Sequence, residues 1–156
     1  MQKLKPITDF TEISPSAKIA VPIHGWRAKC LQRLMRLDLP VPRTVALSAS
    51  TVQAIAAGRS LDCEGVLACF GVAPLVSVRP SPADPEWGGP STVLNVGMNA
   101  ARHAALVLTQ GQAAADALYL RFVQGYAVHV ARLDPDMFEI AEPSAEALRV
   151  ALRAYR

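Results

Sequence analysis

Apolar residues recur every three or four positions along much of the chain, which is the spacing that places side chains on one face of a helix. The pattern is clear in residues 25–37, where Leu31, Leu34 and Met35 share a face and Gly25 frees the start of the helix. A second helix is predicted for residues 113–131, and four of its side chains share a face: Leu118, Phe122, Tyr126 and His129. We interpret that face as core packing.

Capping residues predict further helices. Ser50, followed by Gln53, fits a capping box for a helix that runs through Ala57 and stops at Gly58. Asp134 precedes a proline that suits the first turn of a short helix, and Ser144 precedes a final amphipathic helix carrying apolar residues to the end of the chain (Leu148, Leu152 and Tyr155). Apolar spacing alone predicts short helices at residues 66–70 and 100–108.

Runs of β-branched and apolar residues predict three strands: residues 4–10 as an edge strand interrupted by Pro6, then 44–47 and 75–79. Residues 92–98 form a second apolar segment. The segment from Pro40 to Pro42 must be extended, because a residue before proline avoids the helical region. We therefore expect an α/β (α+β) fold in which a small mixed sheet is flanked by helices and the C-terminal half is helical.

The composition is that of a folded domain. The chain has 156 residues, of which 51% are hydrophobic and 19% charged, so residues 1–156 are expected to form a single domain with its own core. The first residues lack the apolar core of a signal peptide, and no apolar run approaches the ~20 residues that span a bilayer. Three cysteines without zinc-site spacing suit a reducing compartment, so we predict a cytoplasmic protein without a membrane partner.

The charge of the chain argues weakly for an anionic partner. Sixteen basic residues oppose 13 acidic ones, a net charge of +3, and the basic residues are spread along the sequence without the interleaved aromatic residues of single-strand binders. We therefore predict no nucleic-acid partner.

Three separated segments together carry a family resemblance. The first is His24-Gly25-Trp26-Arg27-Ala28-Lys29 with Leu39-Pro40-Val41-Pro42, the second is Leu75-Val76-Ser77-Val78-Arg79 with Thr92-Val93-Leu94-Asn95, and the third is Tyr119-Leu120-Arg121-Phe122 with Met137-Phe138-Glu139. In order and spacing they resemble the GGKGANL and LPVP, LVSVRSGA and DTVLN, and YRRF and LFE segments of the pyruvate phosphate dikinase and phosphoenolpyruvate synthase family. The resemblance covers nearly the whole chain from Gly25 onward.

The resemblance implies the first subdomain of an ATP-grasp nucleotide-binding domain, with ATP and Mg²⁺ as cofactors. Arg79 matches the family's phosphate-contacting arginine, Arg27 stands at its phosphate-binding lysine, and Gly88 and Gly89 lie where the family closes over the phosphates. Thr92 is a further candidate for a cofactor contact. The chemistry is independently reasonable, because phosphates need cations and backbone N–H groups that only glycine lets approach closely. Without the resemblance, Arg79 would fit a salt-bridged residue at a strand end and Arg27 a solvated residue at a helix start.

The chain also departs from the family pattern. Trp26 and Ala28 replace glycines around Arg27, and the loop of residues 80–91 carries prolines and Trp87 in place of small residues. The sequence ends before the subdomain that, by resemblance, supplies magnesium carboxylates, so we expect dikinase-like phosphotransferase activity only with a complementing chain or a second copy. The alternative is a non-catalytic regulatory or protein-interaction module that keeps the fold. His103, in a His-Ala-Ala run, is expected to be a helix residue and not a phosphate carrier.

Overall fold

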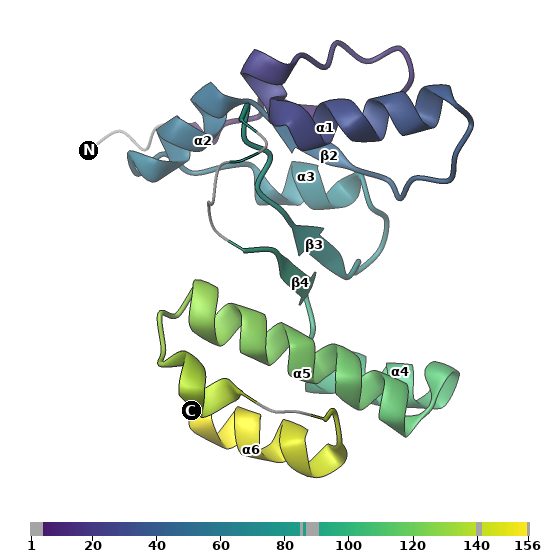
Figure 1. Cartoon of the computed structure of the whole chain (residues 1–156), viewed down its shortest axis with the longest axis vertical. Helices are drawn as coiled ribbons and strands as arrows, with labels where there is room; N and C mark the ends of the chain where they lie inside the picture. The colour runs from purple at the N-terminus through teal and green to yellow at the C-terminus, as the bar shows by residue number, and fades with distance from the viewer. Residues whose placement is uncertain (1–4, 85, 87–90, 140–141, 156) are drawn as a thin grey trace. The chain divides into compact units, whose positions relative to one another are not determined.

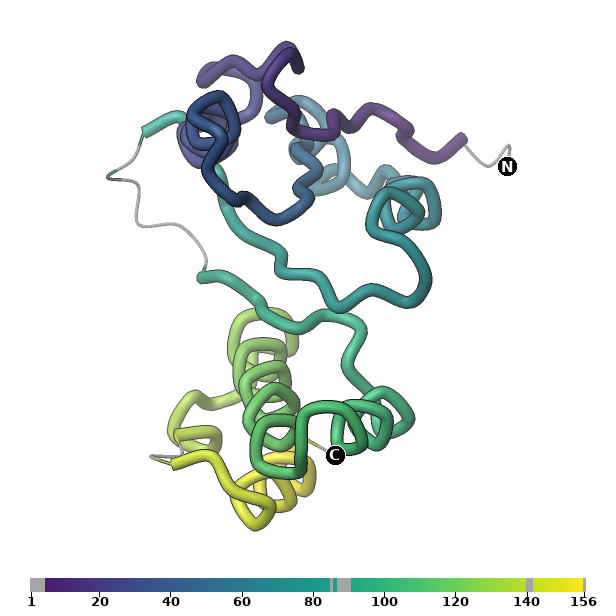
Figure 2. The backbone as a smooth tube through the Cα atoms, turned by 90° about the vertical axis from the view of Figure 1, so that its right-hand side faces the viewer, coloured from purple at the N-terminus to yellow at the C-terminus, as the bar shows by residue number. Residues whose placement is uncertain are grey.

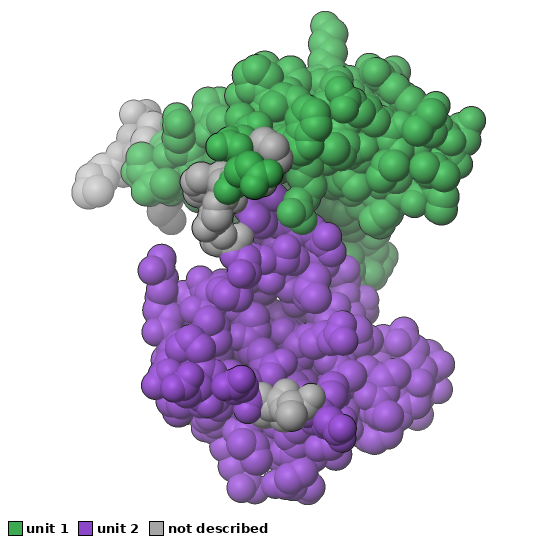
Figure 3. All heavy atoms as spheres, viewed as in Figure 1, with its two compact units in different colours: residues 1–74, 81–89 green, residues 75–80, 90–156 purple. Residues whose placement is uncertain are grey.

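The computed structural model describes residues 5–84, 86, 91–139 and 142–155. Within them the chain forms six α-helices, one 3₁₀ helix and four short strands (Figure 1). Contacts divide the chain into two compact units: unit 1 comprises residues 1–74 and 81–89, and unit 2 comprises residues 75–80 and 90–156 (Figure 3). No helix in the described part of the chain combines the length and apolar character needed to cross a membrane.

Unit 1 contains β1 (Phe10–Glu12), α1 (Val21–Arg36), β2 (Val45–Leu47), α2 (Ala49–Ala56) and α3 (Cys63–Ala68). The two strands pair antiparallel, with Thr11 opposite Ala46. Helix α1 packs against β2 and α2. Its buried Ala28 joins a small core with Ile13, Ile19 and Ala46.

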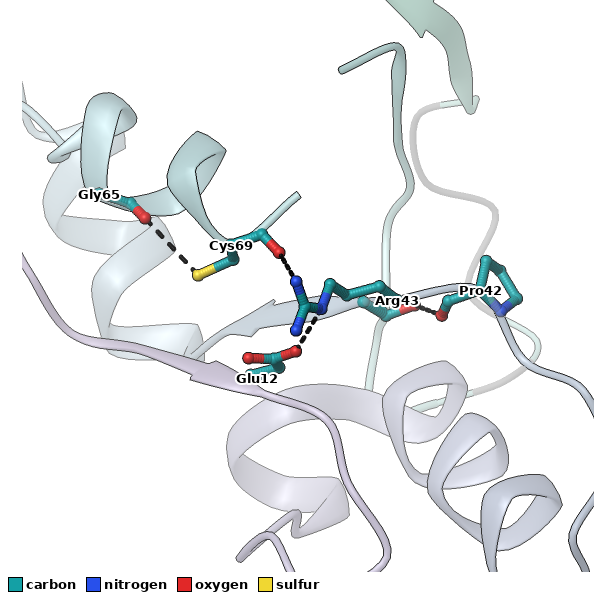
Figure 4. A network of polar contacts seen from close by, with 6 residues as sticks. Glu12, Pro42, Arg43, Gly65 and Cys69 are labelled. Carbon is teal, nitrogen blue, oxygen red and sulfur yellow. Dashed lines mark hydrogen bonds and ion pairs between the residues drawn. The ribbon is translucent and has the colours of Figure 1, made fainter. Parts of the chain in front are cut away.

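A polar network centred on Arg43 connects three parts of unit 1 (Figure 4). The Arg43 Nε lies 2.7 Å from Glu12 Oε1 on β1, and its Nη1 donates to the carbonyl oxygen of Cys69, just after α3, at 2.6 Å. The Cys69 thiol is 3.6 Å from the carbonyl oxygen of Gly65. Because the Arg43 and Glu12 side chains are 60% and 45% exposed, this ion pair contributes little to stability, and it serves mainly to fix the segment that enters β2.

Unit 2 contains β3 (Val76–Val78), β4 (Val93–Val96), α4 (Ala100–Gln110), α5 (Gln112–His129), the 3₁₀ helix η1 (Pro135–Phe138) and α6 (Ala145–Tyr155). Strands β3 and β4 pair antiparallel with an irregular register. Helix α5 packs against β4, α4 and α6, and the tube in Figure 2 shows the three helices grouped together. The core of this unit lies between α5, η1 and α6: Leu120, Val123, Ala127, Phe138, Ala147, Leu148 and Ala151.

The mixed α/β class, the helical C-terminal half and most predicted elements are confirmed. The expected single mixed sheet is wrong: the described residues contain two separate two-stranded antiparallel sheets. These strands have only three or four residues each, and the two sheets belong to different units. The first strand is also displaced: within residues 5–12 it spans Phe10–Glu12, beyond the interruption at Pro6.

Two predictions about helices also require correction. Ser48, and not Ser50, caps α2: its Oγ accepts a hydrogen bond from the backbone N–H of Thr51 at 3.1 Å. On α5 the most buried side chains are Ala115, Asp116, Leu120, Val123 and Ala127, and not the predicted face, on which His129 is exposed. Because α5 contacts two helices and β4, one apolar stripe does not define its buried surface.

Candidate phosphate-binding site

The start of α1 carries the first predicted phosphate contact, Arg27. The helix begins at Val21 with Pro22 in its first turn, and it breaks at Gly25, whose φ of 80° and ψ of 172° are not helical. The chain then continues as a second helical piece over residues 26–36. The break gives this piece its own N-terminal end, where backbone N–H groups lack partners within the helix. The first turn of α1 contains no acidic side chain.

The chain itself supplies partners for two of these N–H groups. The N–H of Trp26 donates to the carbonyl oxygen of Pro82 at 2.7 Å. The N–H of Ala28 donates to the hydroxyl oxygen of Ser81 at 3.0 Å. A phosphate that used these amides would therefore have to replace protein oxygens that already accept their hydrogen bonds.

The Arg27 side chain remains available for a ligand. It is exposed, and its guanidinium makes no hydrogen bond or ion pair to any residue that the structure describes. Its neighbours on the same helix are engaged: Lys29 Nζ donates to the carbonyl oxygen of Ile19 at 2.8 Å, and the guanidinium of Arg33 lies 5.1 Å from the ring centroid of Trp26. A cation at a helix N-terminus is disfavoured by the helix dipole, and a bound anion would relieve this cost.

Arg79 directly follows β3, as the sequence predicts. Its side chain is exposed and has no hydrogen bond or ion pair within the described part of the chain, so the salt-bridged interpretation of this residue finds no partner there. As far as the described residues go, its guanidinium therefore leaves five N–H donors open to an acceptor such as phosphate.

The other predicted contacts contribute less. Thr92 is half-buried immediately before β4. Gly88, Gly89 and Trp87 lie outside the described residues. Arg27 belongs to unit 1, whereas Arg79 and Thr92 belong to unit 2.

The candidate residues suit phosphate better than magnesium. Exposed guanidiniums suit phosphate, which they can bind through two parallel hydrogen bonds. No group of three or more His, Cys, Asp or Glu side chains in the described ranges is placed to hold a metal ion. The binding chemistry that these residues offer is therefore recognition of an anion by arginine side chains.

His103 lies on α4, as expected for a helix residue. Its Nε2 is 2.7 Å from Oδ1 of Asp116, which is only 2% exposed and also accepts a hydrogen bond from the side-chain amide of Gln112 at 2.8 Å. The imidazole also contacts the ring of Tyr119, at 5.5 Å between centroids. These contacts join α4 to α5, and we assign His103 a structural role.

Sequence analysis missed the part that Ser81 and Pro82 play at the start of α1. Ser81 and Ala28 are 53 positions apart, so no local pattern connects them. Gly25 was the one local signal of these contacts. From the sequence we inferred only that this glycine frees the start of the helix.

Comparison with protein-family models gives no match to this chain, and neither does a search of curated proteins.

Proposed function

We propose that this chain is a dikinase-like nucleotide-binding domain, and that Arg79 and Arg27 are each a candidate contact for a phosphate group of ATP. The observation that supports the proposal is the availability of both guanidiniums, which are exposed and have no partner among the described residues. The resemblance of the surrounding segments to the dikinase family selects phosphate as the ligand. Phosphoryl transfer is assigned to a complex with a complementing dikinase-like chain, which would supply the magnesium ligands.

Calorimetric titration with ATP, with and without Mg²⁺, tests this proposal. We expect saturable binding to the wild type and at least a tenfold loss of affinity in Arg79→Ala, because a charged hydrogen bond contributes about 1.5–3 kcal/mol and a tenfold change corresponds to about 1.4 kcal/mol. Arg27→Ala is expected to lower the affinity as well. Arg153→Ala is the matched control, because Arg153 is also exposed and has no partner within the described residues. Equal affinities for the Arg79→Ala and Arg153→Ala variants would contradict the assignment of Arg79.

A second candidate function is a non-catalytic interaction module that keeps the fold without ATP chemistry. The observation that favours it is the use of the Trp26 and Ala28 amides by Pro82 and Ser81, at the place where the dikinase family has a glycine-rich phosphate segment. The same titration separates the two candidates: no detectable heat at millimolar ATP would leave the interaction module as the better interpretation.

A further inference from the structure

The solvent side of α1 carries apolar residues, although the outward stripe of a surface helix is ordinarily polar. The helical piece over residues 26–36 turns Ala28 and Gln32 into unit 1, where both are buried. Residues at helical spacing lie on its opposite side, and we call them the outer face of α1: Trp26, Cys30, Arg33, Leu34 and Leu37. Trp26, Leu34 and Leu37 are 37%, 40% and 70% exposed. An exposed apolar stripe beside charged residues is typical of an interaction surface.

The solvent side of α1 is also positively charged. Between Val21 and Arg36 the helix contains four basic residues and no acidic one. Three arginines are exposed and form no ion pair in the described part of the chain: Arg27, Arg33 and Arg36. Lys29 instead turns inward, because its Nζ donates to the carbonyl oxygen of Ile19 and to Oε1 of Gln32. The cations that α1 presents to solvent are therefore arginines, which are enriched at protein interfaces, whereas lysine is depleted there.

Trp26 and Arg33 form a preorganised pair on the outer face. The guanidinium of Arg33 lies 5.1 Å from the centroid of the Trp26 ring. This contact attracts the cation to the indole and restrains the arginine side chain, while the N–H groups at the edge of the guanidinium stay open to a carboxylate. Tryptophan and arginine are also the residues that most often dominate the binding energy of an interface. The pair thus combines an apolar anchor with a positioned donor.

The charge of the outer face selects its occupant. A second copy of α1 would place arginine against arginine, and like charges disfavour that contact. A lipid bilayer would accept the apolar side chains, but it would draw in Arg33, which lies among them, at the cost of moving a guanidinium into hydrocarbon. An acidic amphipathic helix avoids both costs, because its apolar residues can pack against Trp26 and Leu34 while a carboxylate pairs with Arg33.

We propose that the outer face of α1 docks an acidic amphipathic helix of another protein. Large apolar residues of that helix, spaced three and four positions apart, pack against the apolar side chains of the face, and a glutamate or aspartate accepts two parallel hydrogen bonds from Arg33. All residues of the face belong to unit 1, so the proposal depends on this unit alone. It is independent of ATP binding, because Arg79 and Arg27 are not part of the face.

Calorimetric titration of the full chain with synthetic peptides tests the proposal. The probe is a peptide of about 20 residues, long enough to form a helix, with leucines at heptad spacing and glutamates beside them. A peptide with the same leucines and lysines in place of the glutamates is the control for charge, and phosphatidylserine vesicles are the control for a membrane. We expect saturable binding of the glutamate peptide alone. No binding of that peptide, equal binding of both peptides, or binding of the vesicles alone would overturn the proposal.

Charge reversal at Arg33 identifies the surface. Arg33→Glu is expected to lower the affinity for the glutamate peptide about tenfold or more and to raise the affinity for the lysine peptide, because its carboxylate pairs with lysines. Arg153→Glu is the matched control, because Arg153 is exposed on α6 and has no partner within the described residues. Equal affinities of these two variants for the glutamate peptide would contradict the assignment of Arg33.

The apolar part of the face has its own test. Leu37→Gln is expected to lower the affinity for the glutamate peptide, because it removes a large apolar contact. Leu108→Gln is the control, since Leu108 on α4 is 88% exposed and lies outside the face. Equal affinities for the two variants would contradict docking on the outer face. Arg27 and Arg79 are unchanged in all four variants, so either result leaves the proposed function standing.

Discussion

Gln32 is a polar residue at the centre of unit 1, with 0% of its surface exposed. Its side-chain Nε2 donates to the carbonyl oxygens of Ser14 at 3.0 Å and Ala17 at 2.6 Å, and its Oε1 accepts from Lys29 Nζ at 2.9 Å. Gln32 thereby satisfies the backbone of the irregular segment before α1, which has no strand or helix to do so. The amphipathic pattern placed Gln32 away from the apolar face, and only the fold of the preceding segment over α1 buries it.

Replacing Gln32 by leucine keeps a similar volume but leaves the carbonyl oxygens of Ser14 and Ala17 without this donor. We expect a loss of about 1–3 kcal/mol in the free energy of unfolding, because a polar group that loses its buried partner is left with its desolvation cost. Urea denaturation provides the measurement. Gln53→Leu, at an exposed position on α2, is the control and should change the stability by less than about 0.5 kcal/mol. Equal stabilities for the two variants would contradict the role of Gln32.

At the scale of single elements, the start of α2 offers a direct comparison of two serines. Ser48→Ala removes the hydroxyl that caps the helix at Thr51, and it is expected to cost about 1 kcal/mol in the free energy of unfolding. Ser50→Ala is expected to cost less than about 0.5 kcal/mol, because Ser50 is exposed and does not cap the helix. Thermal or urea unfolding of both variants checks the order, and a larger loss in Ser50→Ala would restore the capping box predicted from the sequence.

The elements were predictable to different degrees because they depend on different information. Helices α1 and α4 follow from local apolar spacing. Helix α6 follows also from its predicted cap, because Ser144 Oγ accepts from the N–H of Ala147 at 3.1 Å. The buried side of α5 depends on neighbours that lie far away in sequence. So does the irregular strand β4, where Asn95 has a φ of 55° and its side-chain amide donates to the carbonyl oxygen of Leu118 at 3.0 Å.

The candidate site shows the same division. Arg27 and Arg79 could be selected from sequence because short segments around them resemble a known pattern. The hydrogen bonds of Ser81 and Pro82 to the amides of Ala28 and Trp26 could not, because each joins residues more than 50 positions apart. Local sequence identified charged side chains, whereas the occupation of the Trp26 and Ala28 backbone amides depended on tertiary structure.

At the scale of the whole molecule, each unit has its own core, centred on α1 in unit 1 and on α5 in unit 2. Leu120 is 1% exposed in the core of unit 2, and Leu120→Ala is expected to cost about 2–5 kcal/mol. Because separate cores can open as separate cooperative groups, hydrogen exchange in this variant should accelerate mainly in α5 and α6 and much less in α1. Exchange that accelerates equally in all three helices would show that the two cores unfold together.

Unit 1 includes residues 81–89, which follow a segment of unit 2 in the sequence. This determines where the protein can be divided for expression. A fragment that stopped at Pro74 would contain every helix and strand that the structure describes in unit 1, yet it would lack the acceptors for the amides of Trp26 and Ala28. Such a fragment would leave Gly25 uncovered and two polar groups without their partners. The C-terminal boundary of a stable fragment therefore lies beyond Pro82, although the last helix of unit 1 ends at Ala68.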